Sequence, residues 1–211
     1  PSIAAVSRFT LETREKRAAA GTRIEIEGGK LKNVSEVGAP VGTLVAIRAL
    51  FYNTPARRKF LKTIHTEMGH IGDTVASIAL GWPGVGFRLR HNDRPVKSWT
   101  AVSEPAERTA DILGRELRKS LHSIEYETDA AALTGWIASP RHTRSTSRSI
   151  YLYVNGRYVR DKVIQHALFA GYAGRIMKGA FPVAVLFLGV PPDQVDVNVH
   201  PTKHEVRFLR Q

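Results

Sequence analysis

The clearest alternation of apolar and polar positions lies near the C-terminal end of the chain. Residues 195–200, Val-Asp-Val-Asn-Val-His, alternate strictly, which predicts a β-strand with valines on one face and polar side chains on the other. Pro201 has no N–H to donate to a strand ladder, so we expect the strand to end there. The pattern therefore places Lys203 on a tight loop just past a buried strand end.

The first hundred residues carry further strand patterns, separated by glycine and proline turns. We expect strands at 3–13, 22–28, 86–91 and 95–100, and a central strand at 43–50, where β-branched and apolar residues dominate.

Two helices are expected between these strands. Thr54 is a plausible N-cap of a short basic helix and Pro55 its first residue. A longer amphipathic helix follows, with Thr66 as its expected N-cap. The residues predicted for its buried side are Ile71, Val75, Ile78 and Ala79.

The second half of the chain repeats this mixture of elements. Asn155-Gly156 is the pair preferred in a two-residue type I′ turn, because both positions need positive φ. The expected elements are a helix at 106–113, strands at 121–127 and 132–138, a hairpin of 149–154 with 157–159, a helix at 161–174 and a strand at 182–190. This order predicts an α/β fold made of two α/β sandwiches, 1–100 and 101–211, each a sheet with helices on one face.

The net charge of the chain indicates a class of binding partner. The 31 Lys and Arg residues exceed the 19 Asp and Glu residues, and the net charge of +12 indicates a polyanionic partner such as nucleic acid or an anionic membrane surface. A basic surface that serves only solubility is the alternative. No apolar run approaches the roughly 20 residues that span a bilayer, and no secretory leader pattern is present, so we expect a cytoplasmic protein without membrane partners.

Metal and disulfide chemistry have little support in the sequence. The chain has no cysteine, which excludes disulfides and thiolate metal sites. His65 and His70 are five residues apart, and Pro201 divides His200 from His204, so neither pair has helical metal-ligand spacing. We therefore predict no metal site formed by this chain.

Basic residues gather around the predicted hairpin. Arg157, Arg160 and Lys162 lie in the hairpin and the first turn of the next helix, with His166 one turn later. Such side chains beside a helix N-terminus suit sequence-independent contact with DNA phosphates, although a solvated charged face is the alternative. No stripe of aromatic residues accompanies them, which favours backbone contact over single-strand stacking. The preceding loop extends the group with Arg141, Arg144 and Arg148.

Three strings in this sequence resemble the MutL-type DNA mismatch-repair ATPases. They are Phe51-Tyr-Asn-Thr-Pro-Ala-Arg57, the run Tyr-Val-Asn-Gly-Arg-Tyr-Val-Arg-Asp-Lys at 153–162, and Asn198-Val-His-Pro-Thr-Lys203. They occur in the family's order and at about its spacing, and the resemblance extends over essentially the whole chain. It implies part of a histidine-kinase-type (GHKL) ATPase fold, followed by a second domain like one found in ribosomal proteins and in the DNA gyrase ATPase region.

The resemblance also implies roles for individual residues. Lys203 would contact the γ-phosphate of ATP, Thr43 would lie at the adenine pocket, and Lys162 would lie in a positively charged groove used for DNA. ATP and magnesium would be the cofactors of the full-length protein. Its implied partners are DNA, a MutS-type mismatch sensor, downstream nicking or helicase enzymes, and a second copy of itself.

The sequence also limits what these residues are expected to do alone. In the family, a glutamate that activates water, an asparagine that holds magnesium and glycine-rich lid segments precede the region matched here. Neither Glu-x-x-x-Asn nor Asp-x-Gly-x-Gly occurs in this chain, so we expect it to bind no cofactor stably and not to hydrolyse ATP by itself. Two other classes stay open, namely a non-enzymatic basic nucleic-acid-binding module and a relative of type II topoisomerase ATPases.

Overall fold

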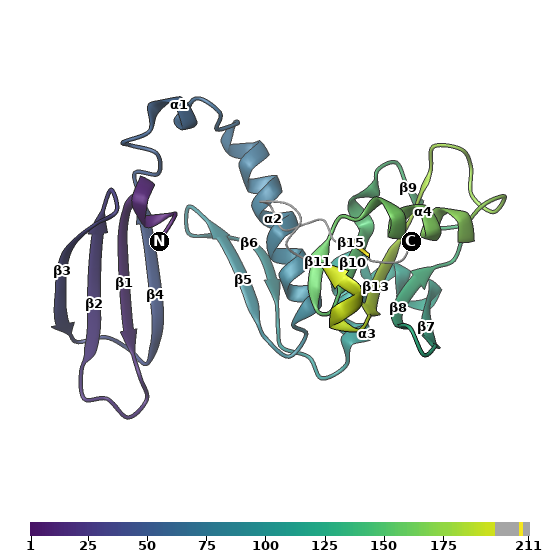
Figure 1. The fold of residues 1–211 in the computed structure, drawn as a ribbon, viewed down its shortest axis with the longest axis horizontal. Coiled ribbons are helices and arrows are strands. Elements are labelled where there is room, and N and C mark those ends of the chain that lie inside the picture. Colours follow the sequence, from purple (N-terminus) through teal and green to yellow (C-terminus); the bar gives the residue numbers. More distant parts are fainter. Residues whose placement is uncertain (197–206, 209–211) are drawn as a thin grey trace. The chain divides into compact units, whose positions relative to one another are not determined.

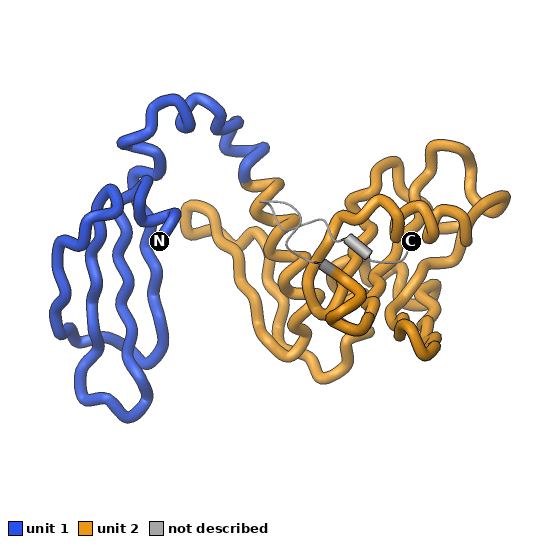
Figure 2. Tube along the Cα trace, viewed as in Figure 1, with its two compact units in different colours: residues 1–67 blue, residues 68–211 orange. Residues whose placement is uncertain are grey.

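The computed structural model describes residues 1–196 and 207–208. The chain forms two compact units, Pro1–Glu67 and Met68–Gln211, coloured separately in Figure 2. The division into domains at 1–100 and 101–211, expected from the order of the elements, stays a prediction. Each unit contains both sheet and helix, which confirms the mixed α/β fold class.

The first unit is built on a four-stranded antiparallel sheet in the order β3-β2-β1-β4 (Figure 1). Its elements are η1 (Ala4–Val6), β1 (Arg8–Arg14), β2 (Gly21–Glu27), β3 (Lys30–Val37), β4 (Gly42–Arg48), α1 (Pro55–Arg58) and the start of α2 (Ile64–Gly81).

Two features of this sheet differ from the sequence prediction. The strand β3 was not predicted, because a bulge opposite Glu25 and Ile26 inserts Lys32 into its ladder and breaks the period-2 pattern. The strand β4 was predicted to be central, but it ends the sheet order formed by the described residues. Its apolar side chains Leu44 and Val45 are accordingly more than half exposed.

The helices follow their predicted positions but not all their predicted details. Pro55 begins α1 as expected, whereas the Thr54 side chain makes no capping hydrogen bond. The helix α2 begins at Ile64, before Thr66. Of the predicted buried set only Ala79 is buried and Val75 is half-buried, whereas Ile71 and Ile78 are 43% and 47% exposed. The small residues Ala76 and Ala79 pack against Trp99 instead, because their size lets the helix approach the following hairpin closely.

The second unit contains the rest of α2 and the described elements that follow it in the chain. These are β5 (Phe87–His91), β6 (Arg94–Trp99), α3 (Pro105–Leu113), η2 (Arg115–Ser120), β7 (Leu121–Glu127), β8 (Ala132–Ala138), β9 (Thr143–Arg144), η3 (Ser147–Ser149), β10 (Ile150–Val154), β11 (Arg157–Val159), α4 (Lys162–Gly171), β12 (Phe181–Pro182), β13 (Ala184–Gly189), η4 (Pro192–Gln194), β14 (Val195–Asp196) and β15 (Arg207–Phe208).

A five-stranded mixed sheet, ordered β11-β10-β13-β8-β7, organises this unit (Figure 1). The strand β10 runs parallel to β13, and every residue of its Ile-Tyr-Leu-Tyr-Val sequence is buried. Tyr151 and Tyr153 pack with Leu80 of α2 and Leu113 of α3 on one face. On the other face, Leu152 and its neighbours pack against α4. The expectation of helices on one face only is therefore wrong for this sheet.

No helix within residues 1–196 is long and apolar enough to cross a membrane.

Candidate nucleic-acid interface

The predicted hairpin is confirmed, and it places the basic residues. Asn155 and Gly156 have φ of 49° and 77°, as a type I′ turn requires. The Asn155 side chain donates to the carbonyl oxygen of Val190 at 3.0 Å and accepts from the Val190 N–H at 2.9 Å. This reciprocal pair fastens the turn to the chain beyond β13, so the exposed Arg157 projects from a fixed position at the start of β11.

The next turn holds two cations on either side of a buried carboxylate. Asp161 caps α4, since its Oδ1 accepts from the Ile164 N–H at 3.0 Å. Arg160 and Lys162 are both exposed on either side of it. The Arg160 guanidinium carbon lies 6.0 Å from the Tyr158 ring centroid, a cation–π distance. The cap therefore fixes the backbone from which both basic side chains extend.

Arg148 and Arg160 both line a cavity of about 270 Å³ within the second unit. They are twelve positions apart in the sequence (160 − 148), one on η3 and one just after β11. Ser147 and Gln165 also line this cavity, and α2 contributes His70 and Asp73. Over the described ranges 1–196 and 207–208, no carboxylate forms an ion pair with either arginine.

Arg144 has a different environment from the other basic candidates. It lies on β9, where its guanidinium Nη2 donates to the carbonyl oxygen of Leu113 at 3.4 Å and lies 3.6 Å from a carboxylate oxygen of Glu116. Arg144 is therefore partly engaged in packing β9 against α3 and η2. Arg141 is exposed in the loop before β9, and His166 is exposed on α4.

Thr43, the predicted nucleotide-site residue, lies near the start of β4. Its Oγ1 is 2.8 Å from the Oγ1 of Thr13, its register partner on β1, and Thr43 is exposed whereas Thr13 is half-buried. Lys203, the predicted γ-phosphate ligand, lies outside the described residues.

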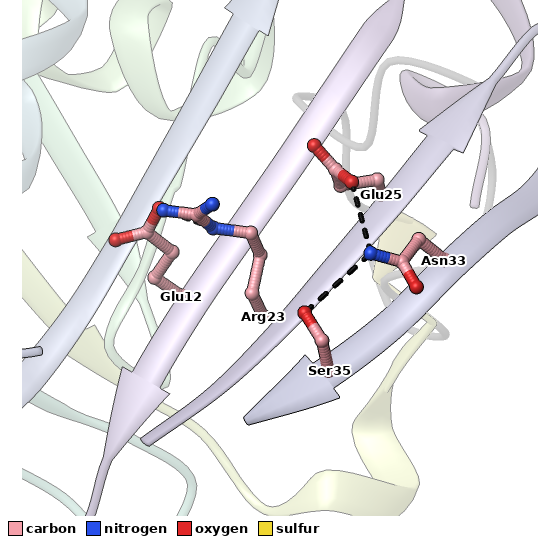
Figure 3. A network of polar contacts seen from close by, with 5 residues as sticks. All are labelled: Glu12, Arg23, Glu25, Asn33 and Ser35. Carbon is pink, nitrogen blue, oxygen red and sulfur yellow. Dashed lines mark hydrogen bonds and ion pairs between the residues drawn. The ribbon is translucent and has the colours of Figure 1, made fainter. Parts of the chain in front are cut away.

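A polar network covers the opposite face of the same sheet (Figure 3). Arg23 on β2 forms an ion pair with Glu12 on β1 at 2.7 Å. Asn33 on β3 donates to Glu25 at 3.3 Å and to Ser35 at 3.5 Å. Because side chains alternate along a strand, Glu12 and Thr13 point to opposite faces, and the network leaves the threonine pair accessible.

Sequence reasoning missed the buried Arg108 of α3, which has no exposed surface. Its Nη1 donates to the carbonyl oxygen of Ala79 at 2.8 Å. Its Nη2 lies within 3.0 Å of three further carbonyl oxygens, those of Pro83, Val85 and Thr100. Burial lowers the pKa of this guanidinium. The residue joins α3 to the end of α2 and to the β5–β6 hairpin, and an arginine within an amphipathic helix gave no sequence signal for that role.

Two tyrosines of β10 complete this side of the sheet. The Tyr153 hydroxyl donates to the carbonyl oxygen of Ser77 in α2. Burial, with the Asp73 carboxylate as a second cause, raises the pKa of Tyr151 to about 12. Tyr151 therefore keeps its proton at neutral pH and lines the cavity as a neutral group.

Among the residues that the structure describes, no three His, Asp or Glu side chains are grouped so that they could hold a metal ion.

Comparisons with known proteins decide the family. Residues 109–211 match the model of the DNA mismatch repair protein, C-terminal domain. The DNA mismatch repair protein MutL of Syntrophotalea carbinolica is 50% identical over 212 residues, covering 100% of this chain and 34% of that protein. The chain belongs to the MutL family. A second MutL, from Geotalea uraniireducens, is 47% identical over 211 residues, covering 100% of this chain and 35% of that protein.

A solved MutL structure supports the same assignment at the level of fold. The Aquifex aeolicus MutL ATPase domain complexed with ADP is 28% identical, with a TM-score of 0.74 over 90% of this chain and 70% of that one. The predicted kinship with the GHKL ATPase fold is thereby confirmed, and the MutL matches rule against the topoisomerase alternative. The chain spans about a third of the length of the curated relatives that it matches.

Proposed function

We propose that this MutL-type chain binds the DNA backbone through the basic surface formed by Arg148, Arg157, Arg160 and Lys162, as part of an ATP-dependent coordinator of mismatch repair. The observation that carries this proposal is the capped turn, where the buried Asp161 holds Arg160 and Lys162 on exposed neighbouring positions. Cations fixed on a rigid turn lose less conformational entropy on binding phosphates than cations on a mobile tail.

Backbone contact, rather than base reading, suits these residues. Basic side chains near a helix N-terminus neutralise phosphates without reading sequence, and a net charge of +12 adds long-range attraction. Arg144 contributes less in this proposal, since its guanidinium already contacts Leu113 and Glu116.

The nucleotide roles of Thr43 and Lys203 are part of the same proposal. The Thr13–Thr43 hydroxyl pair fits a site that hydrogen-bonds a nucleobase, directly or through water. Lys203 would neutralise phosphate charge, and ATP with magnesium would supply the transferable γ-phosphoryl group in the full-length protein. The solved MutL ATPase domain with ADP supports nucleotide binding in this family.

We further propose that these 211 residues do not hydrolyse ATP by themselves, because the chain contains neither Glu-x-x-x-Asn nor Asp-x-Gly-x-Gly. In the whole protein, nucleotide binding would drive self-association and relay detection by a MutS-type sensor to nicking or helicase enzymes. The alternative, a non-enzymatic basic nucleic-acid-binding module, predicts the same DNA contact without any nucleotide dependence.

The test is binding of a fluorescent DNA duplex across a salt series. We expect the affinity of the wild-type chain to fall steeply with salt, as counterion release requires. The substitution Lys162→Glu should weaken binding about tenfold or more at low salt and reduce the slope of log K against log salt by about 1. The matched control is Lys178→Glu, which makes the same charge change at another exposed lysine.

This control distinguishes DNA binding through the local basic surface from attraction by the net charge of the whole chain. Equal losses in Lys162→Glu and Lys178→Glu would show that only net charge matters. Absence of salt-dependent binding by the wild-type chain would mean that the basic surface is merely solvated, and the proposal would be wrong.

A further inference from the structure

The cavity between α2 and the basic turn has the size and lining of an anion site. Its volume of about 270 Å³ leaves room for a tetrahedral oxyanion with some of its hydration. Three of the segments that line it are α2, through His70, η3, through Ser147 and Arg148, and the turn after β11, through Arg160. A ligand there would contact all three segments at once.

The charges on the walls favour an anion. Two guanidinium groups, those of Arg148 and Arg160, and one carboxylate, that of Asp73, line the cavity, so these three groups together carry a formal charge of +1 (2 − 1). Within the described part of the chain neither arginine forms an ion pair, and the Arg160 guanidinium contacts the Tyr158 ring. Guanidinium forks match the oxygens of phosphate, and the Ser147 hydroxyl and Gln165 amide add neutral donors.

Asp73 lowers the positive charge of this site but does not cancel it, because two guanidinium groups and one carboxylate line the cavity. Its carboxylate is close enough to Tyr151 to oppose ionisation of that hydroxyl, and Tyr151 stays protonated at neutral pH. The same negative charge would repel an anion held by the arginines and so weaken its binding. Asp73 thus lowers the affinity of the cavity for an anion but does not prevent binding.

We propose that this cavity binds one phosphate group between Arg148 and Arg160, and that the bound phosphate joins α2 to the sheet of the second unit. The phosphate can belong to a DNA backbone, which rests on the proposed function, or to a free phosphate. In either case the phosphate would add a contact between α2 and this sheet to the Tyr153–Ser77 hydrogen bond and the packing of Leu80.

The experiment measures the binding of two ligands to the full 211-residue chain. One is a short DNA duplex, titrated across a salt series, and the other is inorganic phosphate, titrated by calorimetry. Arg148→Ala and Arg160→Ala should each weaken binding of the occupying ligand about tenfold, as expected for a charge-assisted contact. In the duplex arm each should also lower the salt slope by up to about 1. Asp73→Asn should strengthen binding by about threefold, a direction that misfolding does not produce.

The matched control is Arg94→Ala, which removes an exposed arginine of β6 that does not line the cavity and should leave both titrations unchanged. Circular dichroism of each variant verifies that its fold is retained.

The two arms separate this inference from the proposed function. If Lys162→Glu weakens duplex binding while both arginine variants bind duplex and inorganic phosphate like the wild type, the cavity proposal is wrong, and DNA contact stands with Arg157 and Lys162 but without Arg148 and Arg160. If the duplex does not bind but inorganic phosphate binds and is lost in both arginine variants, the cavity is a free-phosphate site and the DNA function is wrong. If neither ligand binds the wild-type chain, both proposals are wrong.

Discussion

Arg108 is the residue on which the packing of α3 depends most. Water cannot replace the partners of its four hydrogen bonds, because the side chain is fully buried. Its Nε is also buried and has no hydrogen-bond partner among the described residues. The protein therefore carries a desolvated charge whose cost is offset by carbonyl dipoles, by the Asp111 carboxylate and by the Phe87 ring, 5.8 Å away.

Arg108→Met should lower the free energy of unfolding by about 3 kcal/mol or more, since several buried carbonyls lose their donor at about 1–3 kcal/mol each and such losses do not add fully. Arg108→Lys should recover only part of this, because an ammonium lacks the planar fork that reaches four carbonyls. Urea unfolding measures both. The exposed Arg94→Met should change stability by no more than about 0.5 kcal/mol, and an equally small effect of Arg108→Met would contradict the assigned role.

Single residues were predictable where their own chemistry decides their conformation. Pro55 and the Asn155-Gly156 turn are confirmed, since a fixed ring or a positive φ leaves few alternatives. Arg108 was not predictable, because its carbonyl partners lie 8 to 29 residues away in sequence. Asp73 and His70 likewise gave no signal, since only the packing of α2 brings them to a cavity lined by residues 147–165.

At the level of elements, the contact between β8 and β13 depends on a glycine. Gly135 of β8 has φ of 141°, and a Cβ at this position would lie 2.1 Å from the carbonyl oxygen of Val185 on β13. No side chain could move aside, because the obstructing atom belongs to the backbone of a central strand.

Gly135→Ala should therefore destabilise the sheet by about 3 kcal/mol or more, combining backbone strain with overpacking. The control is Gly171→Ala at the end of α4, where an added Cβ meets no atom within 4 Å, so the change should be neutral or stabilising by up to about 1 kcal/mol. Thermal and urea unfolding of the two variants provide the measurement. Similar stabilities of the two variants would show that β8 and β13 can separate without cost.

Elements were predictable from sequence to the extent that their patterns were uninterrupted. The bounds of β7 and β8 agree with the prediction, 121–127 and 132–138, because the turn between them ends both runs. The strand β3 was missed because its bulge shifts the period by one residue. For α2, periodicity marked the large apolar residues, whereas the structure buries the small ones that fit against Trp99.

For the whole molecule, the family and fold class followed from sequence strings, while the arrangement of the basic residues did not. The motif containing Lys162 predicts a DNA-binding groove only by resemblance. The structure adds that Arg148 and Arg160 share one cavity and that Arg144 contacts Glu116 instead. This sorting depends on tertiary packing between η3, β11 and α2, which no local pattern encodes.

The most direct test of the central claim, DNA contact through the basic surface of the second unit, is hydrogen–deuterium exchange of the chain with and without a DNA duplex. We predict slower exchange in the loop at 140–149 and in the turn at 157–165. The strands β1–β3 should show no change. Slower exchange confined to the basic segment at 55–62, or none in either unit at saturating duplex, would contradict the account.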